Sequence, residues 1–162
     1  MLDLIGISKL VRSVLCVLIL MISGAGYGYV EQLTRRLDDG SDSSLYSLHG
    51  PILTLSFFTP ECTWCKKQHR VLTELVVICR ELNPVMVGIN GNKVDYKQTL
   101  RRMSNTLPAI VAPQGLVAAL PNLSVPRVIV IDSKWQVVTH LVGFSDAEML
   151  LDILQQNNMC SS

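Results

Sequence analysis

The sequence is poor in charge and in aromatic side chains. Charged residues make up 17% of its 162 residues and aromatic residues 6%, whereas an ordinary soluble domain carries about 25% charged residues. A disordered chain would be polar and highly charged, so this composition excludes one. The formal net charge of +1, without any run of Lys and Arg, provides no basic field to attract nucleic acid. We therefore expect a folded protein with no nucleic acid partner.

Apolar residues are abundant instead, at 49% of the chain, with a mean hydropathy of +0.35. A chain of this length suits one domain with a short appendage. Much of the apolar excess lies in one run, from Val14 to Ile22. Residues 1–28 hold two of the 14 Lys and Arg residues and one of the 13 Asp and Glu residues, which leaves 12 of each sign in the remainder. Bulk charge therefore does not select the partners of that remainder.

The N-terminal apolar run has the layout of an export signal. Lys9 and Arg12 precede it, and small residues from Ser23 to Gly26 follow it, as in signal peptides with an apolar core of about 7–15 residues. We predict that residues 1–25 are a signal peptide. An uncleaved anchor is the alternative, because residues 13–30 are uncharged and a spanning helix needs about 17–25 residues. A buried first helix of a cytosolic fold is the third interpretation.

The positive charges before the run place the remainder across the membrane under both export interpretations. We expect it in the bacterial periplasm, soluble after cleavage or tethered to the inner membrane by the uncleaved helix. Residues 26–44 are interpreted as a linker with a candidate short helix ending at Leu37, because an Asp/Gly/Ser cluster follows. Residues 45–158 are the predicted domain, and residues 159–162 are a polar tail.

Hydrophobic periodicity predicts alternating strands and helices within that domain. The expected strands are 52–58, 85–89, 128–131 and 136–142. The expected helices are 64–82, stopped by Asn83-Pro84, then 95–103, and 145–156 with Ser145 as the N-cap. Residues 107–120 are ambiguous because two prolines and a glycine interrupt them. Near-continuous apolar strands alternating with helices indicate an α/β fold.

The sharpest chemical motif is Cys62-Thr63-Trp64-Cys65, placed between a buried strand and a helix. Two cysteines at this spacing can form a disulfide across the first turn of the helix. The helix N-terminus favours a thiolate on the first sulfur. Cys62 would then be the attacking nucleophile, and Cys65 would resolve the mixed disulfide. The same motif also forms half of a zinc site, but no second pair follows to complete a four-ligand site.

Residues 52–66, which end in this motif, resemble the active-site strand and helix of the thioredoxin superfamily. Val125-Pro126, followed by apolar residues up to Asp132, resembles the family's cis-proline loop and the strand after it. Residues 109–120 occupy the place where exported TlpA-like and ResA-like members carry an extra strand and helix. Gly143-Phe144 is similar to the turn into the last helix. The resemblance covers residues 45–157.

The resemblance implies a thioredoxin-like fold, with a mixed central sheet flanked by helices and a TlpA-like central insertion. It implies a protein-disulfide oxidoreductase, in which Cys62 and Cys65 are the redox pair and Pro126 is cis beside them. Trp64, Val125 and Arg127 are the expected substrate-binding residues. Protein disulfides are the expected substrates, and a membrane protein is the expected electron donor or acceptor. The TlpA-like character favours reduction over oxidation, and no cofactor or metal is expected.

Several positions depart from the family pattern. Many thioredoxins have a buried Asp at the position of Ser56, so another group or water must deprotonate Cys65. Glu61 stands where thioredoxins often have Trp, and a carboxylate there disfavours the thiolate, whereas Lys66 and Arg127 favour it if they are near. The sign of the net effect stays open. The hairpin that leads TlpA-like domains is also expected to be shortened, between residues 44 and 50.

The remaining cysteines and histidines carry weaker predictions. Cys79 is interpreted as a small apolar core residue, and Cys160 as a thiol that is either free or paired with Cys79. His69 is interpreted as a solvated helix residue, because Lys66 and Arg70 flank it. The alternative function is a copper-binding metallochaperone with a thioredoxin fold, in which His140 or His69 is the third ligand. A non-catalytic binding module is the third hypothesis.

Overall fold

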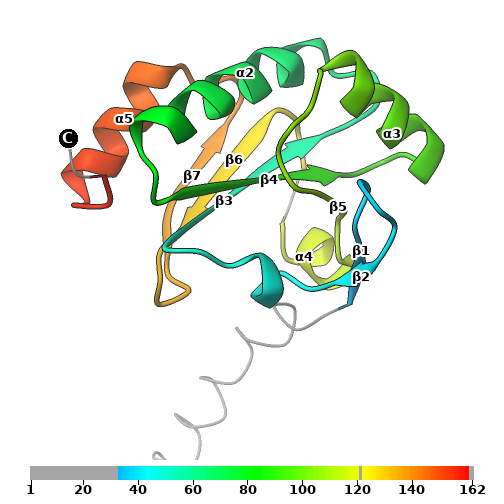
Figure 1. The fold of residues 1–162 in the computed structure, drawn as a ribbon, viewed down its shortest axis with the longest axis horizontal. Coiled ribbons are helices and arrows are strands. Elements are labelled where there is room, and N and C mark those ends of the chain that lie inside the picture. The colour runs from blue at the N-terminus through cyan, green and yellow to red at the C-terminus, as the bar shows by residue number, and fades with distance from the viewer. Residues whose placement is uncertain (1–32, 121, 161–162) are drawn as a thin grey trace, which may run out of the picture.

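The computed structural model describes residues 33–120 and 122–160, so the predicted signal peptide lies outside the described residues. A five-stranded mixed sheet with the order β5-β4-β3-β6-β7 forms its centre (Figure 1). The strands β3, β4 and β5 are parallel, and β6 and β7 are antiparallel to their neighbours. Their bounds are Ile52–Phe58, Leu82–Gly88, Ala109–Val111, Arg127–Ile131 and Val137–Val142.

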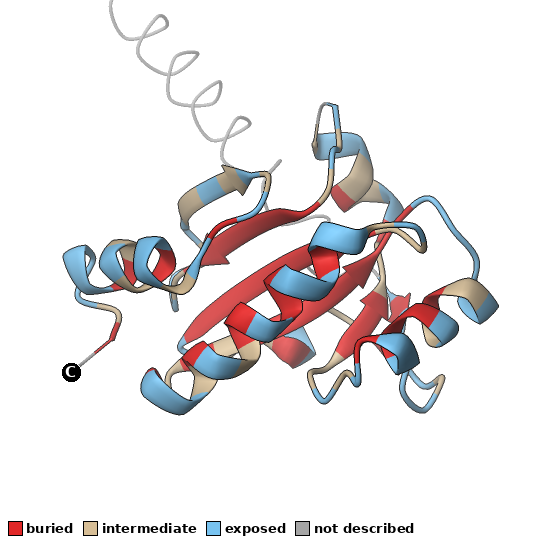
Figure 2. Cartoon of the chain, turned by 90° about the horizontal axis from the view of Figure 1, so that it is seen from above, coloured by how far each residue is buried: buried red, intermediate tan, exposed pale blue. Residues whose placement is uncertain are grey.

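Helices cover both faces of this sheet. Figure 1 shows α2 (Thr63–Ile78), α3 (Lys93–Arg102) and α5 (Ala147–Gln156) on one face, with α4 (Gln114–Ala119) and the 3-10 helix η1 (Tyr46–Leu48) on the other. All seven residues of β3 are buried, because β4 and β6 flank it and helices lie above and below (Figure 2). The predicted mixed α/β fold is confirmed. The β5 strand and α4 are the expected central insertion.

The first long helix is shorter than its apolar pattern predicts. It ends at Ile78, and Asn83-Pro84 lies inside β4 instead of after a helix. A proline removes one strand hydrogen bond and is therefore tolerated only where no partner strand lies. The amide of Met86 donates to the carbonyl of Pro108, the residue just before β5. The β5 strand pairs only with Met86 to Gly88. The nitrogen of Pro84 faces the same side beyond the end of β5, so no pairing is lost there.

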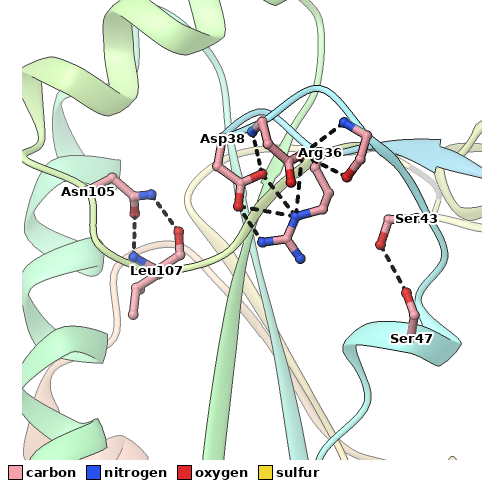
Figure 3. Close-up of polar contacts among 8 residues, drawn as sticks. Arg36, Asp38, Ser43, Ser47, Asn105 and Leu107 are labelled. Atoms are coloured by element: carbon pink, nitrogen blue, oxygen red, sulfur yellow. Dashed lines mark hydrogen bonds and ion pairs between the residues drawn. The ribbon is translucent and has the colours of Figure 1, made fainter.

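The segment before η1 forms a hairpin, not the candidate short helix. Its strands are β1 (Thr34–Arg35) and β2 (Asp42–Ser43). Leu37 is 2% exposed and its amide donates to Ala109, so this hairpin packs on the sheet edge. Arg36 binds Asp38 within the turn, and other polar contacts hold the neighbouring loops, as Figure 3 shows. The leading hairpin therefore lies earlier than the expected position between residues 44 and 50.

The C-terminal helix α5 begins at a different cap from the predicted one, and a disulfide joins the tail after it to α2. The N-cap of α5 is Asp146, whose side chain accepts from the amide of Met149; the predicted cap, Ser145, is buried instead. Cys79 caps the C-terminus of α2 and forms a disulfide with Cys160, with a Cα–Cα distance of 5.4 Å. Cys79 is therefore a covalent partner of the tail, and not only the small apolar core residue that its surroundings in the sequence predict.

Within the two described ranges, no helix combines the length and the apolar character required to cross a membrane.

Candidate active site

Cys62 and Cys65 lie at the start of α2, directly after the buried strand β3. Their sulfurs form a disulfide, with a Cα–Cα distance of 5.3 Å. Cys62 is the N-cap residue, with extended backbone, and its Sγ accepts the amide of Cys65 at 3.1 Å. Cys62 is half-buried, whereas Cys65 is 1% exposed. The two sulfurs therefore differ in access, and Cys62 is the one that a large substrate can reach.

The N-terminus of α2 sets the electrostatics of Cys62. The first amides of a helix are unpaired donors and carry the positive end of the helix dipole, which stabilises a thiolate. The amide of Cys65 already points at the Sγ of Cys62. The Sγ of Cys65 lies instead 3.7 Å from the carbonyl oxygen of Phe57, in an apolar cluster. This environment favours the thiolate on Cys62 over one on Cys65.

The Val125-Pro126 peptide bond is cis, as the resemblance implied. Val125 and Cys62 both pack against the apolar cluster that contains Cys65. The amide of Gly143 donates to the carbonyl of Pro126 at 2.9 Å, and Gly143 has a φ of +91°. Glycine adopts this conformation without a steric penalty. The turn after β7 is therefore bound to the proline loop.

An exposed aromatic pair lies next to the disulfide. Trp64 is 51% exposed and Phe144 is 39% exposed, and their ring centroids are 5.6 Å apart. The Nζ atom of Lys67 lies 3.9 Å from the centroid of the Trp64 ring, which is a cation–π contact. Phe144 reaches this place because it follows Gly143. The resemblance matches Phe144 to the family turn but does not predict its place in the site.

Arg127 occupies a different position from the other predicted substrate-binding residues. It is 3% exposed, and its Nη2 donates to the carbonyl of Asn122 at 2.8 Å. Because side chains alternate along a strand, Arg127 shares the sheet face of Ile129, which packs with η1 and α4. This is the face opposite α2. Arg127 therefore holds the loop that leads to Pro126.

Ser56, at the position of the family's buried Asp, is 1% exposed. Among the described residues, the buried polar side chains include only one that titrates near neutral pH, His69 at 5% exposure. The prediction that His69 is solvated is wrong, because Met103 and Asn105 lie against this side of α2. Burial lowers the pKa of His69, and a hydrogen bond with Asn105 opposes the shift. Its Nε2 has no partner.

The described residues do not bring together the Cys and His ligands that the copper-binding alternative requires. Across residues 33–120 and 122–160, no group of three or more His, Cys, Asp and Glu side chains could hold a metal ion. His140 lies on β7, opposite Ile129 of β6. Its pKa is lowered by partial burial and by the charge of Arg127.

A pocket of about 270 Å³ adjoins Cys62 on the side of α3. Glu61, Lys66 and Arg102 contribute charged side chains to its lining. Nothing in the sequence places Arg102 near Cys62, since the residues are 40 positions apart. The order of β3 and β4, each followed by a helix on the same face, brings them together.

No family model and no curated sequence matches the chain. Solved structures match it in fold. One is DsbF of MTB, solved in mixed oxidized and reduced forms, at 19% identity over 82% of this chain and 96% of that one, with a TM-score of 0.68. Another is a secreted Mycobacterium tuberculosis disulfide oxidoreductase homologous to E. coli DsbE, at 14% identity over 79% and 97%, with a TM-score of 0.64.

A thioredoxin-like protein from Aeropyrum pernix is also similar, at 13% identity over 90% of this chain and 98% of that one, with a TM-score of 0.67. The described residues therefore have the thioredoxin-like fold of thiol-disulfide oxidoreductases. This chain combines that fold with a Cys-x-x-Cys pair at the start of its first long helix and a cis peptide bond at Val125-Pro126.

Proposed function

We propose that the protein exchanges thiols and disulfides with protein substrates through Cys62 and Cys65. The observation that carries the proposal is the unequal placement of the two sulfurs. Cys62 is accessible at the N-terminus of α2 and Cys65 is buried, while Val125 of the cis-proline loop packs against the apolar cluster that contains Cys65. Such a pair can form a mixed disulfide at one sulfur and resolve it with the other.

In the reducing direction the protein begins as the dithiol. The Cys62 thiolate attacks one sulfur of a substrate disulfide, which forms a mixed disulfide and releases the other substrate sulfur as a thiolate. Cys65 then loses its proton, and its thiolate attacks the Sγ of Cys62. The mixed disulfide breaks, the second substrate thiolate leaves, and the Cys62–Cys65 disulfide forms. Two electrons pass to the substrate, whose two thiolates take up two protons.

The surrounding residues hold the substrate and the loop. The backbone at Val125 and Pro126 lies alongside the extended substrate chain, and Trp64 supplies an exposed apolar contact. Phe144 extends that contact, since its ring lies against Trp64. Arg127 acts by positioning, because it is buried and binds the carbonyl of Asn122 in the proline loop.

Export is supported by the N-terminal apolar run and by the cysteines. All four cysteines among residues 33–160 are paired in disulfides, and structural disulfides persist in oxidising compartments. One protein of similar fold is a secreted disulfide oxidoreductase. We propose that the protein works as a reductase outside the cytoplasm and is recharged by a membrane electron donor. The protein can perform this role whether the N-terminal segment is cleaved as a signal peptide or retained as a membrane anchor.

Trapping the mixed disulfide tests the proposal. A Cys65→Ser variant should accumulate a covalent adduct with a disulfide-containing protein such as insulin, visible on a non-reducing gel. A Cys62→Ser variant should form none and should lose insulin reduction. A variant with Cys79 and Cys160 both changed to Ala is the matched control and should retain reduction. Equal insulin reduction by the wild type and Cys62→Ser would refute the proposal.

The reduction potential of the Cys62–Cys65 couple tests the direction. Reductases of the thioredoxin type have potentials near about −270 mV, and strong oxidants lie near about −120 mV. We expect a value near the first, measured by equilibration with glutathione or dithiothreitol. A value near the second would replace reduction with oxidation, while a value below about −300 mV would indicate a structural bridge.

A further inference from the structure

A charged groove runs from Cys62 along the side of α2 that faces α3. Its first part is the pocket of about 270 Å³ beside Cys62, and its second part is a pocket of about 140 Å³ farther along α2. Lys66 and Met103 line both pockets, so the two are adjacent. We call this surface the α2–α3 groove.

The α2–α3 groove carries an excess of positive charge. Lys66, Arg70 and Arg102 line it, against the single carboxylate of Glu61. The ion pairs of the described residues all lie in the β1–β2 hairpin, where they join Arg35 and Arg36 to nearby aspartates. The three cations of the groove therefore have no anionic partner within residues 33–120 and 122–160.

Arg102 is fixed over the loop that precedes Cys62. Its Nη2 donates to the Oγ1 of Thr99 at 2.9 Å and to the carbonyl of Pro60 at 3.3 Å. Thr99 itself donates to the same carbonyl at 3.2 Å. The remaining guanidinium donors of Arg102 are available to a ligand that enters from Cys62, because guanidinium carries five N–H groups. An arginine held in this way loses little side-chain entropy on binding a carboxylate.

The second pocket contains a buried, unpartnered polar atom. The imidazole of His69 lines it, and its Nε2 has no hydrogen-bond partner although His69 is 5% exposed. Buried polar atoms in folded proteins are nearly always paired.

We propose that the α2–α3 groove binds an acidic stretch of the substrate polypeptide next to its reactive cysteine. The inference rests on the proposed exchange at Cys62 and adds the chemistry of the substrate to it. The groove runs from Cys62 to Arg70, eight helical positions or roughly 12 Å. An extended chain covers this distance in about four residues, at about 3.3 Å each. Asp or Glu side chains two to four positions from the substrate cysteine therefore meet Lys66, Arg70 and Arg102.

Charge variants with peptide substrates test this inference. Three peptides of equal length carry one cysteine in a disulfide with a chromophoric thiol, and differ in having Asp and Glu, Asn and Gln, or Lys at positions two to four from it. The reduced protein should react with the acidic peptide about tenfold faster than with the neutral one, and most slowly with the basic one. Raising the salt concentration should reduce these differences, because exposed charges are screened.

Arg102→Glu should abolish or reverse the preference for the acidic peptide, measured as the ratio of its rate to the rate with the neutral peptide in the same variant. Arg101→Glu is the matched control, since it changes the net charge equally but Arg101 does not line the groove. Its Nε contacts only the carbonyl of Lys97. Arg101 and Arg102 are both exposed, so we expect both variants to fold, which circular dichroism checks. Equal rates for the three peptides, or equal effects of Arg101→Glu and Arg102→Glu, would overturn the inference.

Binding without chemistry separates this inference from the proposed function. The acidic peptide with Ser in place of Cys is titrated into the oxidised protein, and chemical shifts of the amides along α2 and α3 are followed. Saturable binding that weakens at least about fivefold in Arg102→Glu supports the groove even if no peptide exchanges disulfides. No binding of the Ser peptide overturns the groove proposal even if exchange at Cys62 is confirmed.

Discussion

The side chain of Gln68 forms two buried hydrogen bonds with the backbone of Ser145. The Nε2 of Gln68 donates to the carbonyl at 3.1 Å, and its Oε1 accepts the amide at 2.9 Å. Gln68 is 0% exposed and Ser145 is 3% exposed. This double contact joins the middle of α2 to the turn before α5, and so holds Phe144 beside Trp64.

Replacing Gln68 with Leu should destabilise the protein by about 2–4 kcal/mol. The apolar side chain leaves the amide and the carbonyl of Ser145 buried without partners, at a cost of about 1–3 kcal/mol for each. Urea unfolding followed by circular dichroism measures the change. Gln98→Leu on the exposed side of α3 is the control and should change the free energy of unfolding by less than about 0.5 kcal/mol. A Gln68→Leu midpoint equal to the wild type would show that these bonds contribute nothing.

Replacing Trp64 with Ala should weaken reaction with protein substrates more than reaction with small ones. We expect kcat/KM for insulin to fall about tenfold, as is common for a central aromatic contact, while the rate with a small aryl disulfide stays within about twofold. Stopped-flow or turbidity assays give both rates. Because Trp64 is exposed, its removal should leave the unfolding midpoint nearly unchanged. An equal loss for both substrates would argue instead for a change in the reactivity of Cys62.

Removing the Cys79–Cys160 disulfide should lower stability and preserve activity. Its loop spans 81 positions, and native disulfides contribute typically about 2–4 kcal/mol by restricting the unfolded chain. The double Cys→Ala variant at these positions should therefore unfold at a lower urea concentration than the wild type, with Cys62–Cys65 oxidised in both. Mass spectrometry of the alkylated wild type should find no free thiol at either position. An unchanged midpoint would exclude a stabilising role.

The buried His69 should make stability depend on pH. Burial lowers its pKa below the ordinary value of 6.5, so the unfolded state binds the proton more tightly than the folded state. The contribution of neutral His69 is complete above pH 6.5, and the free energy of unfolding should fall as the pH drops below that value toward the folded pKa. Lys66 and Arg70 are the charged residues that line the same pocket, and the hydrogen bond with Asn105 opposes the shift.

His69→Gln should flatten this dependence of the free energy of unfolding on pH. Urea unfolding between about pH 7.5 and 5.5 would measure it, since most carboxylates titrate below this range. His140 also has a lowered pKa, so His140→Gln is the comparison. Because His140 is exposed, its variant should retain most of the wild-type slope. Equal slopes in the wild type and His69→Gln would contradict the prediction.

Local pattern predicted β3, β6, β7 and the redox motif, because each is recorded in adjacent residues. The run Ile52–Phe58 is uniformly apolar and forms β3 with the predicted bounds. The end of α2 was not predictable in the same way. Leu82 continues the helical spacing, but it pairs with Ile52 in β4, and a strand partner thirty positions away leaves no local signal.

The rest of the candidate site depends on contacts between distant segments. Cys62, Cys65 and Pro126 were found from their motifs, and the cis bond at Pro126 was predicted from the resemblance and confirmed. Arg127 follows Pro126 but faces away from α2, since strand alternation directs it to the other side of the sheet. His69 is flanked by Lys66 and Arg70 in sequence and is nevertheless buried, because α3 and Asn105 close over that side of α2.

The disulfide between Cys79 and Cys160 also closes a covalent ring of the chain from residue 79 to residue 160. This ring contains α3 with Arg102, the Val125-Pro126 loop, and the turn at Gly143-Phe144. A protease that cuts one exposed loop within this ring, for example near the α4 turn, leaves two fragments that stay linked by sulfur. The nicked protein should therefore run as one species without reductant and separate only when reduced. After such a cut, the segments that follow the cleaved loop would remain covalently joined to the C-terminal end of α2.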